Sequence, residues 1–152
     1  AAYLMAELRK LGAQPLPGRG DMAAPFSFTA GSRDGGSALV GGGPDGTVRV
    51  EVEPGEPLDE AVLRSYCLGA VHQGLSWVSA ESLVVTADGT VADLTVRSLG
   101  ILRAIDPPVE LTVRPGGGPP VAVSDAVFAA TAAALWTAQG FPPSWPTRLP
   151  VR

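Results

Sequence analysis

The pattern that most constrains the fold is a strict alternation of apolar and polar side chains between Thr47 and Glu53. Val48, Val50 and Val52 fall on one side of this segment, and mostly charged side chains fall on the other. Successive side chains of a β-strand point to opposite faces of its sheet. The pattern therefore predicts a strand in a sheet that is covered on one face and open to solvent on the other.

Other segments carry strand signals of the same kind. Residues 109–114 alternate in the same way, and Phe26 and Phe28 alternate with Ser27 and Thr29. The segment from Ser37 to Gly43 predicts a further strand that ends in glycines and a turn at residues 44–46. Strands over 82–86 and 90–97 are predicted on either side of Asp88-Gly89, because this residue pair favours a tight hairpin turn. Several short strands and turns indicate a mostly antiparallel sheet.

Three helices are predicted around these strands. Residues 2–11 form an amphipathic helix with Leu4, Leu8 and Leu11 on one face. A second helix runs from a cap at Asp59 to about Val78, and a third from a cap at Ser124 to about Gln139. The third is apolar on nearly all sides, so we expect it to be buried on more than one side. The second contains Gly69 and Gly74, which a helix accepts where another backbone or a ligand comes close.

These elements predict an α+β fold in which helices pack on a mostly antiparallel sheet. The length of 152 residues suits one domain, here residues 1–152, either alone or as part of a larger multi-chain or multi-domain assembly. Residues 12–24 are rich in Pro and Gly and are predicted to be a loop, so we attribute the Arg-Gly-Asp triplet at 19–21 to chance. Residues 140–152 contain four prolines and are predicted to be an extended tail.

Composition excludes several classes of function. A net charge of −4 argues against a nucleic-acid partner or an anionic lipid surface. No run of about 20 apolar residues is present, so no membrane span is expected. A single cysteine, Cys67, rules out an internal disulfide and a thiolate metal cluster. With no signal peptide pattern at the N-terminus, these features predict a cytoplasmic location.

The residues offer few candidates for chemistry. His72 has no second His or Cys near it in sequence and is interpreted as structural or as a surface residue. Cys67 lies in an apolar helical stripe, which indicates core packing. Alternation along the strand places Glu51 and Glu53 on its solvent face, and helix capping accounts for Asp59 and Glu60. Neither pair is therefore interpreted as an acid/base dyad. The tryptophans could line a pocket, but we interpret them mainly as core or interface residues: Trp77, Trp136 and Trp145. No catalytic residue and no metal ligand are predicted.

A longer pattern resembles a known family. Residues 69–85 read GAVHQGLSWVSAESLVV, Asp88-Gly89 follows, and residues 105–110 read IDPPVE. This order resembles the C-terminal region of the molybdenum-cofactor subunit of the xanthine dehydrogenase/aldehyde oxidase family. There a G-x-x-x-Q-G-x-G-type helix precedes an E-E-L strand, an acidic-Gly hairpin, a P-P-x-E strand, a Gly-rich loop and an A-x-A-[VI]-F-x-A helix. The similarity extends weakly from Pro25 to about Pro146.

The resemblance implies the fold of that family's C-terminal molybdopterin-binding domain. It also implies that this chain would contact molybdopterin through Gln73, Gly116, Gly117 and Gly118, and only together with other chains. The chain departs from the family at two positions. Gly118 stands where the G-x-G-E-P loop has its catalytic glutamate, and glycine cannot accept a proton. Tyr66 stands near a family glutamine that helps to hold the cofactor.

Three interpretations follow. The first is a non-catalytic relative or subunit of a molybdenum hydroxylase, with a structural or assembly role and other subunits or a homo-oligomer as partners. The second is a cofactor-contacting fragment of an active split molybdopterin-dependent oxidoreductase, in which backbone amides of the Gly-rich loop bind the cofactor. The third is a free-standing module that binds a ligand or a protein. The vacant base position favours the first.

Overall fold

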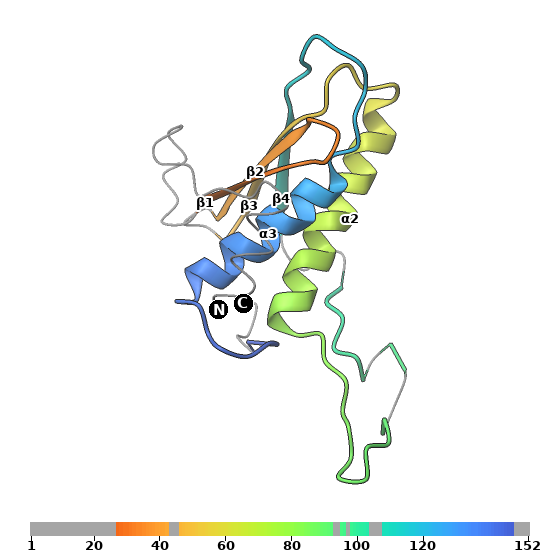
Figure 1. The fold of residues 1–152 in the computed structure, drawn as a ribbon, viewed down its shortest axis with the longest axis vertical. Helices are drawn as coiled ribbons and strands as arrows, with labels where there is room; N and C mark the ends of the chain where they lie inside the picture. The colour runs from red at the N-terminus through yellow and green to blue at the C-terminus, as the bar shows by residue number, and fades with distance from the viewer. Residues whose placement is uncertain (1–26, 43–45, 93–94, 97, 104–107, 148–152) are drawn as a thin grey trace.

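The computed structural model describes residues 27–42, 46–92, 95–96, 98–103 and 108–147. Within them, the chain forms a four-stranded sheet with two helices packed on one face (Figure 1). The α+β class is therefore confirmed. The predicted helix over 2–11 and the loop over 12–24 lie outside the described residues.

The sheet has the strand order β1-β2-β3-β4. Strands β1 (Ser27–Gly31), β2 (Ser37–Gly42) and β3 (Val48–Glu53) form two antiparallel pairs, and β4 (Val109–Val113) pairs with β3 in parallel. The sheet is thus mixed and mostly antiparallel. The parallel pair requires a crossover connection, which the chain between Pro54 and Pro108 provides.

Register places the inward side chains in two rows across the sheet. One row is Phe28, Val40, Val50 and Leu111, and the other is Ala30, Ala38, Val52 and Val113. These rows belong to the core beneath the helices. The alternation of Val48–Glu53 is the reason, because every second side chain of β3 faces the same way.

The opposite face of the sheet is polar, as predicted. Arg49 Nε lies 3.0 Å from Glu110 Oε2, and Arg114 Nε lies 2.6 Å from Glu51 Oε1. Both ion pairs join β3 to β4 or to the residue after it. Glu51 is accordingly a partner in a surface ion pair and not half of an acid/base dyad.

Helix α2 (Glu60–Ser79) begins where the sequence predicts. The side chain of Asp59 accepts hydrogen bonds from the backbone N–H groups of Ala61 and Val62, so it caps the helix as expected. The inward face of α2 contributes Cys67, Val71 and Leu75 to the core.

Helix α3 (Ser124–Ala138) packs on β1 and β2 and also on α2. This arrangement explains why it is apolar on nearly all sides. The predicted cap at Ser124 is wrong, because Val123 holds the cap position and no side chain caps this helix. Val123 is buried, so an apolar residue is favoured at this position over a polar cap.

Residues 80–103, here called the arm, leave the helices and project away from the sheet (Figure 1). The predicted strands over 82–86 and 90–97 are not present in the described residues; one antiparallel bridge joins Val85 to Val91. The turn at Asp88-Gly89 does form, and the Asp88 carboxylate accepts hydrogen bonds from the hydroxyls of Thr86 and Thr90. These bonds lower the pKa of Asp88. Two short strands that pack on nothing are not enough for a stable sheet.

Two hydrogen bonds hold the base of the arm. Ser82 N donates to Leu99 O at 2.9 Å and joins the two ends of the arm, and Leu102 N donates to Ser76 Oγ of α2 at 3.1 Å. The ring nitrogen Nε2 of His72 bonds to Leu102 O. His72 therefore has a structural role in this fold, which agrees with the interpretation from sequence.

A candidate binding groove between two helices

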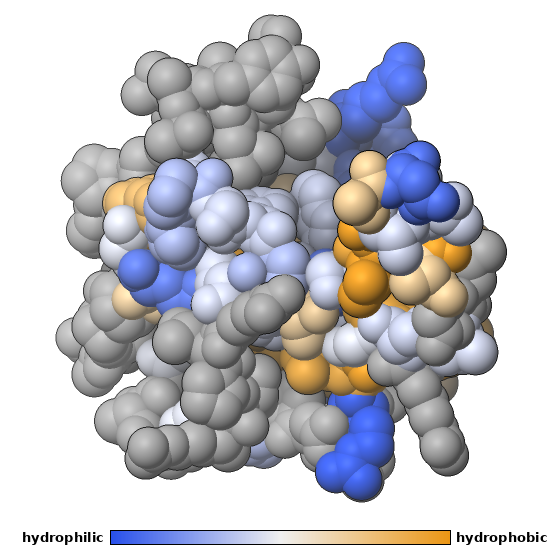
Figure 2. Space-filling view, turned by 90° about the horizontal axis from the view of Figure 1, so that it is seen from below, coloured by the Kyte–Doolittle hydropathy of each residue, from blue (hydrophilic) through white to orange (hydrophobic). Residues whose placement is uncertain are grey.

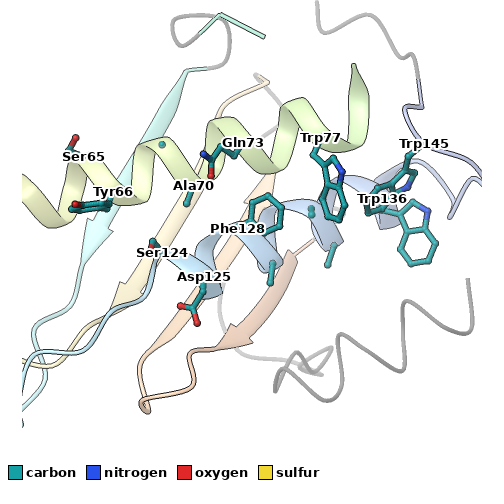
Figure 3. Close-up of a pocket in the computed structure, with 14 residues that line it drawn as sticks. Ser65, Tyr66, Ala70, Gln73, Trp77, Ser124, Asp125, Phe128, Trp136 and Trp145 are labelled. Atoms are coloured by element: carbon teal, nitrogen blue, oxygen red, sulfur yellow. The ribbon is translucent and has the colours of Figure 1, made fainter. Parts of the chain in front are cut away.

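A groove of about 660 Å³ runs along the outer side of α2 and α3 (Figure 3). The two helices form its walls, and Trp145 from the segment after α3 closes one end. Its lining residues are Ser65, Tyr66, Gly69, Ala70, Gln73, Trp77, Ser124, Asp125, Phe128, Ala129, Ala132, Ala133, Trp136 and Trp145. Most of this lining is apolar, which is typical of sites that bind small molecules or helices.

Helices α2 and α3 approach closely at Gly74, and the groove lies beside this contact. A Cβ atom added to Gly74 would lie 3.0 Å from Thr131 Cβ and 3.1 Å from Phe128 O, so glycine permits the contact. At Gly69 a Cβ atom would meet no atom within 4 Å. The two glycines of α2 therefore serve the two purposes expected of them: one admits a neighbouring backbone, and the other borders an open site.

One end of the groove is aromatic. The ring of Trp77 stacks on Phe128 at a centroid distance of 5.4 Å and meets the edge of Trp145 at 4.8 Å. The indole N–H of Trp136 donates to Pro142 O at 2.9 Å, which satisfies the polar atom of this buried ring. Trp136 and Trp145 also form a small core cluster with Val78 and Ala132. The tryptophans are therefore both packing residues and lining residues.

The other end of the groove is polar. Tyr66, Gln73 and Asp125 are exposed side chains on its walls (Figure 3). Asp125 is the one charged residue among the lining residues that the structure describes, and no Lys or Arg accompanies it. It lies in the first turn of α3, where a carboxylate interacts favourably with the helix dipole. An acidic and apolar groove suits a neutral or basic occupant better than an anion.

Cys67 lies on the inner side of α2 and takes no part in the groove. Its side chain is buried, and burial raises the pKa of the thiol to about 11, although the nearby charge of Arg64 partly opposes this shift. A thiol with so high a pKa stays protonated and unreactive at neutral pH. The interpretation of Cys67 as a core residue is confirmed.

The structure separates the residues that the family resemblance brought together. Gln73 lies in the groove, whereas Gly116, Gly117 and Gly118 lie on the loop between β4 and α3 and are not among the groove residues. The loop instead packs on residues 54–56: Gly116 N donates to Gly55 O at 3.3 Å, and Glu56 N donates to Gly118 O at 3.2 Å. Gly118 has a φ of +137°, which favours glycine.

These observations test whether the described residues alone fit a molybdenum cofactor. The amide of Gly116 is engaged by Gly55, and the groove around Gln73 presents a carboxylate and no cation. A phosphate-bearing pterin needs donors or positive charge. In the described part of the chain, the residues do not fit this group, and no group of three His, Cys, Asp or Glu side chains could hold a metal ion.

Sequence reasoning did not predict the groove itself. A signal was present: Tyr66, Gly69, Gln73 and Trp77 recur at helical spacing and form an outward stripe on α2. Only the position of α3 beside this stripe makes it one wall of a groove.

Comparison with known proteins gives matches in structure only; no protein-family model and no curated protein matches the chain. The fold is similar to quinoline 2-oxidoreductase from Pseudomonas putida 86, with 12% identity over 72% of this chain and a TM-score of 0.52. It is also similar to CO dehydrogenase from Oligotropha carboxidovorans, with 10% identity over 75% of this chain and a TM-score of 0.55. A Cu,Mo-CO dehydrogenase matches with 11% identity over 82% of this chain and a TM-score of 0.54.

The fold therefore resembles part of the molybdenum hydroxylases of the xanthine oxidase family. The matched regions make up only 15% to 17% of those chains, so this chain spans about a sixth of their length. Among the described residues, no helix has the length and apolar character to cross a membrane.

Proposed function

We propose that this chain is a non-catalytic component of a cytoplasmic molybdenum hydroxylase-like assembly, in which it acts as a structural partner of larger chains. The proposal rests on the difference between two coverages: the structural match includes most of this chain but only a small part of each matched chain. In this proposal, protein outside these 152 residues supplies the rest of any cofactor site.

The vacant base position supports the non-catalytic role. By the sequence resemblance alone, Gly118 corresponds to the family's glutamate, and a Cβ atom added there would meet no atom within 4 Å. The space for a side chain is therefore open, but no proton acceptor occupies it. A contact with molybdopterin through Gly116, Gly117, Gly118 or Gln73 belongs to the alternative of a cofactor-contacting fragment, and it too requires a partner chain.

The arm supports the assembly role. It projects from the body and exposes apolar side chains that a lone domain would normally bury: Leu83, Val84, Val85, Val96 and Ile101. Figure 2, seen from the end where the arm projects, shows hydrophobic surface gathered on one side. Exposed apolar side chains gathered on one part of a molecule are typical of protein–protein contact sites. We assign this surface to the larger chains of the assembly.

The test is native mass spectrometry of the protein purified from its own host, with molybdenum quantified on the same sample. We expect a complex with larger chains that contains molybdenum and stays active when Gly117 is replaced by Ala. Loss of molybdenum in that variant would instead favour a cofactor-contacting fragment of a split enzyme. A metal-free monomer or homodimer would overturn the proposal and leave a free-standing binding module.

The Gly118→Glu variant tests the non-catalytic role directly. We expect the carboxylate alone to create no hydroxylase activity, because the described residues around it do not form a cofactor site. Gly118→Gln is the matched control, since it carries the same backbone strain at a φ of +137° without a base. Turnover by the Glu variant and not by the Gln variant would contradict the proposal.

A further inference from the structure

The groove between α2 and α3 has the size and lining of a site for a small molecule that is apolar at one end and polar at the other. Its volume of about 660 Å³ lies within the range of roughly 300 to 1,000 Å³ that is usual for small-molecule pockets. Four buried alanines form its floor, and their small side chains leave room above them: Ala70, Ala129, Ala132 and Ala133. Larger side chains lie at the two ends of this floor (Figure 3).

The aromatic end offers a surface for an apolar ring. Trp77 stacks on Phe128, and 43% of Trp77 is still exposed, so part of this surface is open to an occupant. Asp125 precedes Phe128 by three residues in α3, and residues at this spacing lie on the same side of a helix. Three residues correspond to a rise of about 5 Å. A ligand whose ring lies on Phe128 therefore needs only a short chain to reach Asp125.

The polar end carries negative charge. Asp125 is the one charged residue among the described lining residues. Arg64 is not a lining residue: its guanidinium lies 2.7 Å from Glu60 Oε1 and donates to Leu111 O of β4 at 2.8 Å. The start of α3 contributes a helix dipole equivalent to about half a positive charge, which a full carboxylate outweighs. This end of the groove therefore favours a cation over an anion.

We propose that the groove binds an organic cation in which an apolar ring is joined by a short alkyl chain to a protonated amine. The ring lies on Phe128 and Trp77, and the ammonium group donates to the Asp125 carboxylate. One oxygen of this carboxylate accepts from Ala126 N at 2.8 Å, which leaves the second oxygen for the ligand. This inference does not rest on the proposed function.

The test is a titration of the full chain with three probes of similar shape and different charge: phenylbutylamine, phenylbutanol and phenylbutyrate. All three tryptophans of the chain line the groove, so their emission reports its occupancy. We expect the amine to bind about tenfold more tightly than the carboxylate, because the same charge attracts one probe and repels the other. The uncharged alcohol should have an intermediate affinity.

A charge-removing variant tests the role of the carboxylate. Asp125→Asn should weaken binding of the amine about fivefold, the upper end for an exposed ion pair, and leave binding of the alcohol unchanged. Asp88→Asn is the matched control, because it removes the same charge at the turn of the arm, outside the groove, and an Asn-Gly pair also favours that turn. The control should change the affinity for none of the probes.

A blocking variant tests the position of the site. Gly69→Leu should abolish binding of the amine and the alcohol, because its side chain enters the groove from a position where a Cβ atom meets no atom within 4 Å. Ala61→Leu is the matched control, since Ala61 is an exposed residue of α2 outside the groove. It should leave both affinities unchanged.

Several outcomes would overturn the proposal. Equal affinities for the amine and the carboxylate would show that the groove does not select a cation. Binding that Gly69→Leu leaves unchanged would place the site elsewhere, and no binding of the amine at millimolar concentration would show that the groove is not its site. Wild-type dimers that Gly69→Leu dissociates would assign the groove to a second copy of the chain.

Discussion

The two faces of α2 each contain a glycine, and the two glycines have different surroundings. The inner face holds Cys67, Val71 and Gly74 against the sheet and α3, and all three are buried. The outer face presents Gly69 and Trp77 to the groove, and both are exposed. On the inner face glycine is required by a neighbour, whereas on the outer face no described atom requires it. The structural role of a glycine in a helix therefore depends on the packing around it.

The difference has an energetic consequence. Glycine costs about 1 kcal/mol relative to alanine in a helix interior at either position. At Gly74 the close contact with Thr131 offsets this cost, because it allows the two helices to bury their apolar surfaces. At Gly69 no contact within the described residues offsets it. Three experiments test the difference between the two faces.

The largest expected effect is at the helix crossing. Gly74→Leu should lower the free energy of unfolding by about 3 kcal/mol, because the side chain collides with the backbone at Phe128 and with Thr131. Thr131 cannot move away easily, since its hydroxyl donates to Val127 O at 2.7 Å in the buried interface. Chemical denaturation measures the loss. An unchanged midpoint would mean that the crossing is not as tight as the structure shows.

The next effect is a pH dependence of the stability, which the buried thiol of Cys67 on the inner face of α2 causes. Burial raises the pKa of Cys67 to about 11 from an ordinary value of 9.0. In the unfolded chain the thiol ionises at the lower value, so its contribution to stability is complete below about pH 9 and is lost as the pH rises toward 11. The loss should approach about 2 kcal/mol.

Denaturation of wild type and Cys67→Ala between pH 8 and pH 11, roughly the range set by the two pKa values, isolates this contribution. The variant should be less stable at pH 8, because a small cavity replaces the sulfur, but it should lose less stability as the pH rises. Parallel pH curves for the two proteins would show that the thiol is not desolvated.

The smallest effect is expected on the outer face. Gly69→Ala should raise the free energy of unfolding by about 1 kcal/mol, since alanine favours the helix and the added methyl group enters open space. Gly74→Ala is the matched comparison, and its Cβ atom would lie within 3.1 Å of Phe128 O and Thr131. The two substitutions should therefore differ in sign or strongly in size. Equal gains at both positions would refute the distinction between the two faces.

Much of the fold could be predicted because periodicity and caps are local properties. The alternation from Val48 to Glu53 identified both faces of β3, and Asp59 identified the start of α2. The prediction failed where tertiary context overrode a local signal. The buried Val123 holds the cap position of α3 before Ser124, and the segments beside Asp88-Gly89 form a single bridge because they pack on no other element of the described chain.

The candidate site was less accessible to prediction. The family resemblance selected Gln73, which lies in the groove, and the Gly116–Gly118 loop, which lies outside it. The three tryptophans were interpreted mainly as packing residues. Trp136 is indeed buried in a core cluster, but all three tryptophans also line the groove. A residue's place in a cavity depends on the elements beside it, and the sequence contains no local signal for them.

The four strands of the sheet, the start of α2, the polar face of the sheet and the burial of Cys67 could be predicted from the sequence, because they follow from side-chain periodicity and capping along one element. The sequence did not indicate that β4 pairs in parallel with β3, that Gly74 rather than Gly69 meets α3, or that the outer face of α2 borders a groove. Those features depend on contacts between residues far apart in the chain, and such contacts are set by the joint packing of several elements.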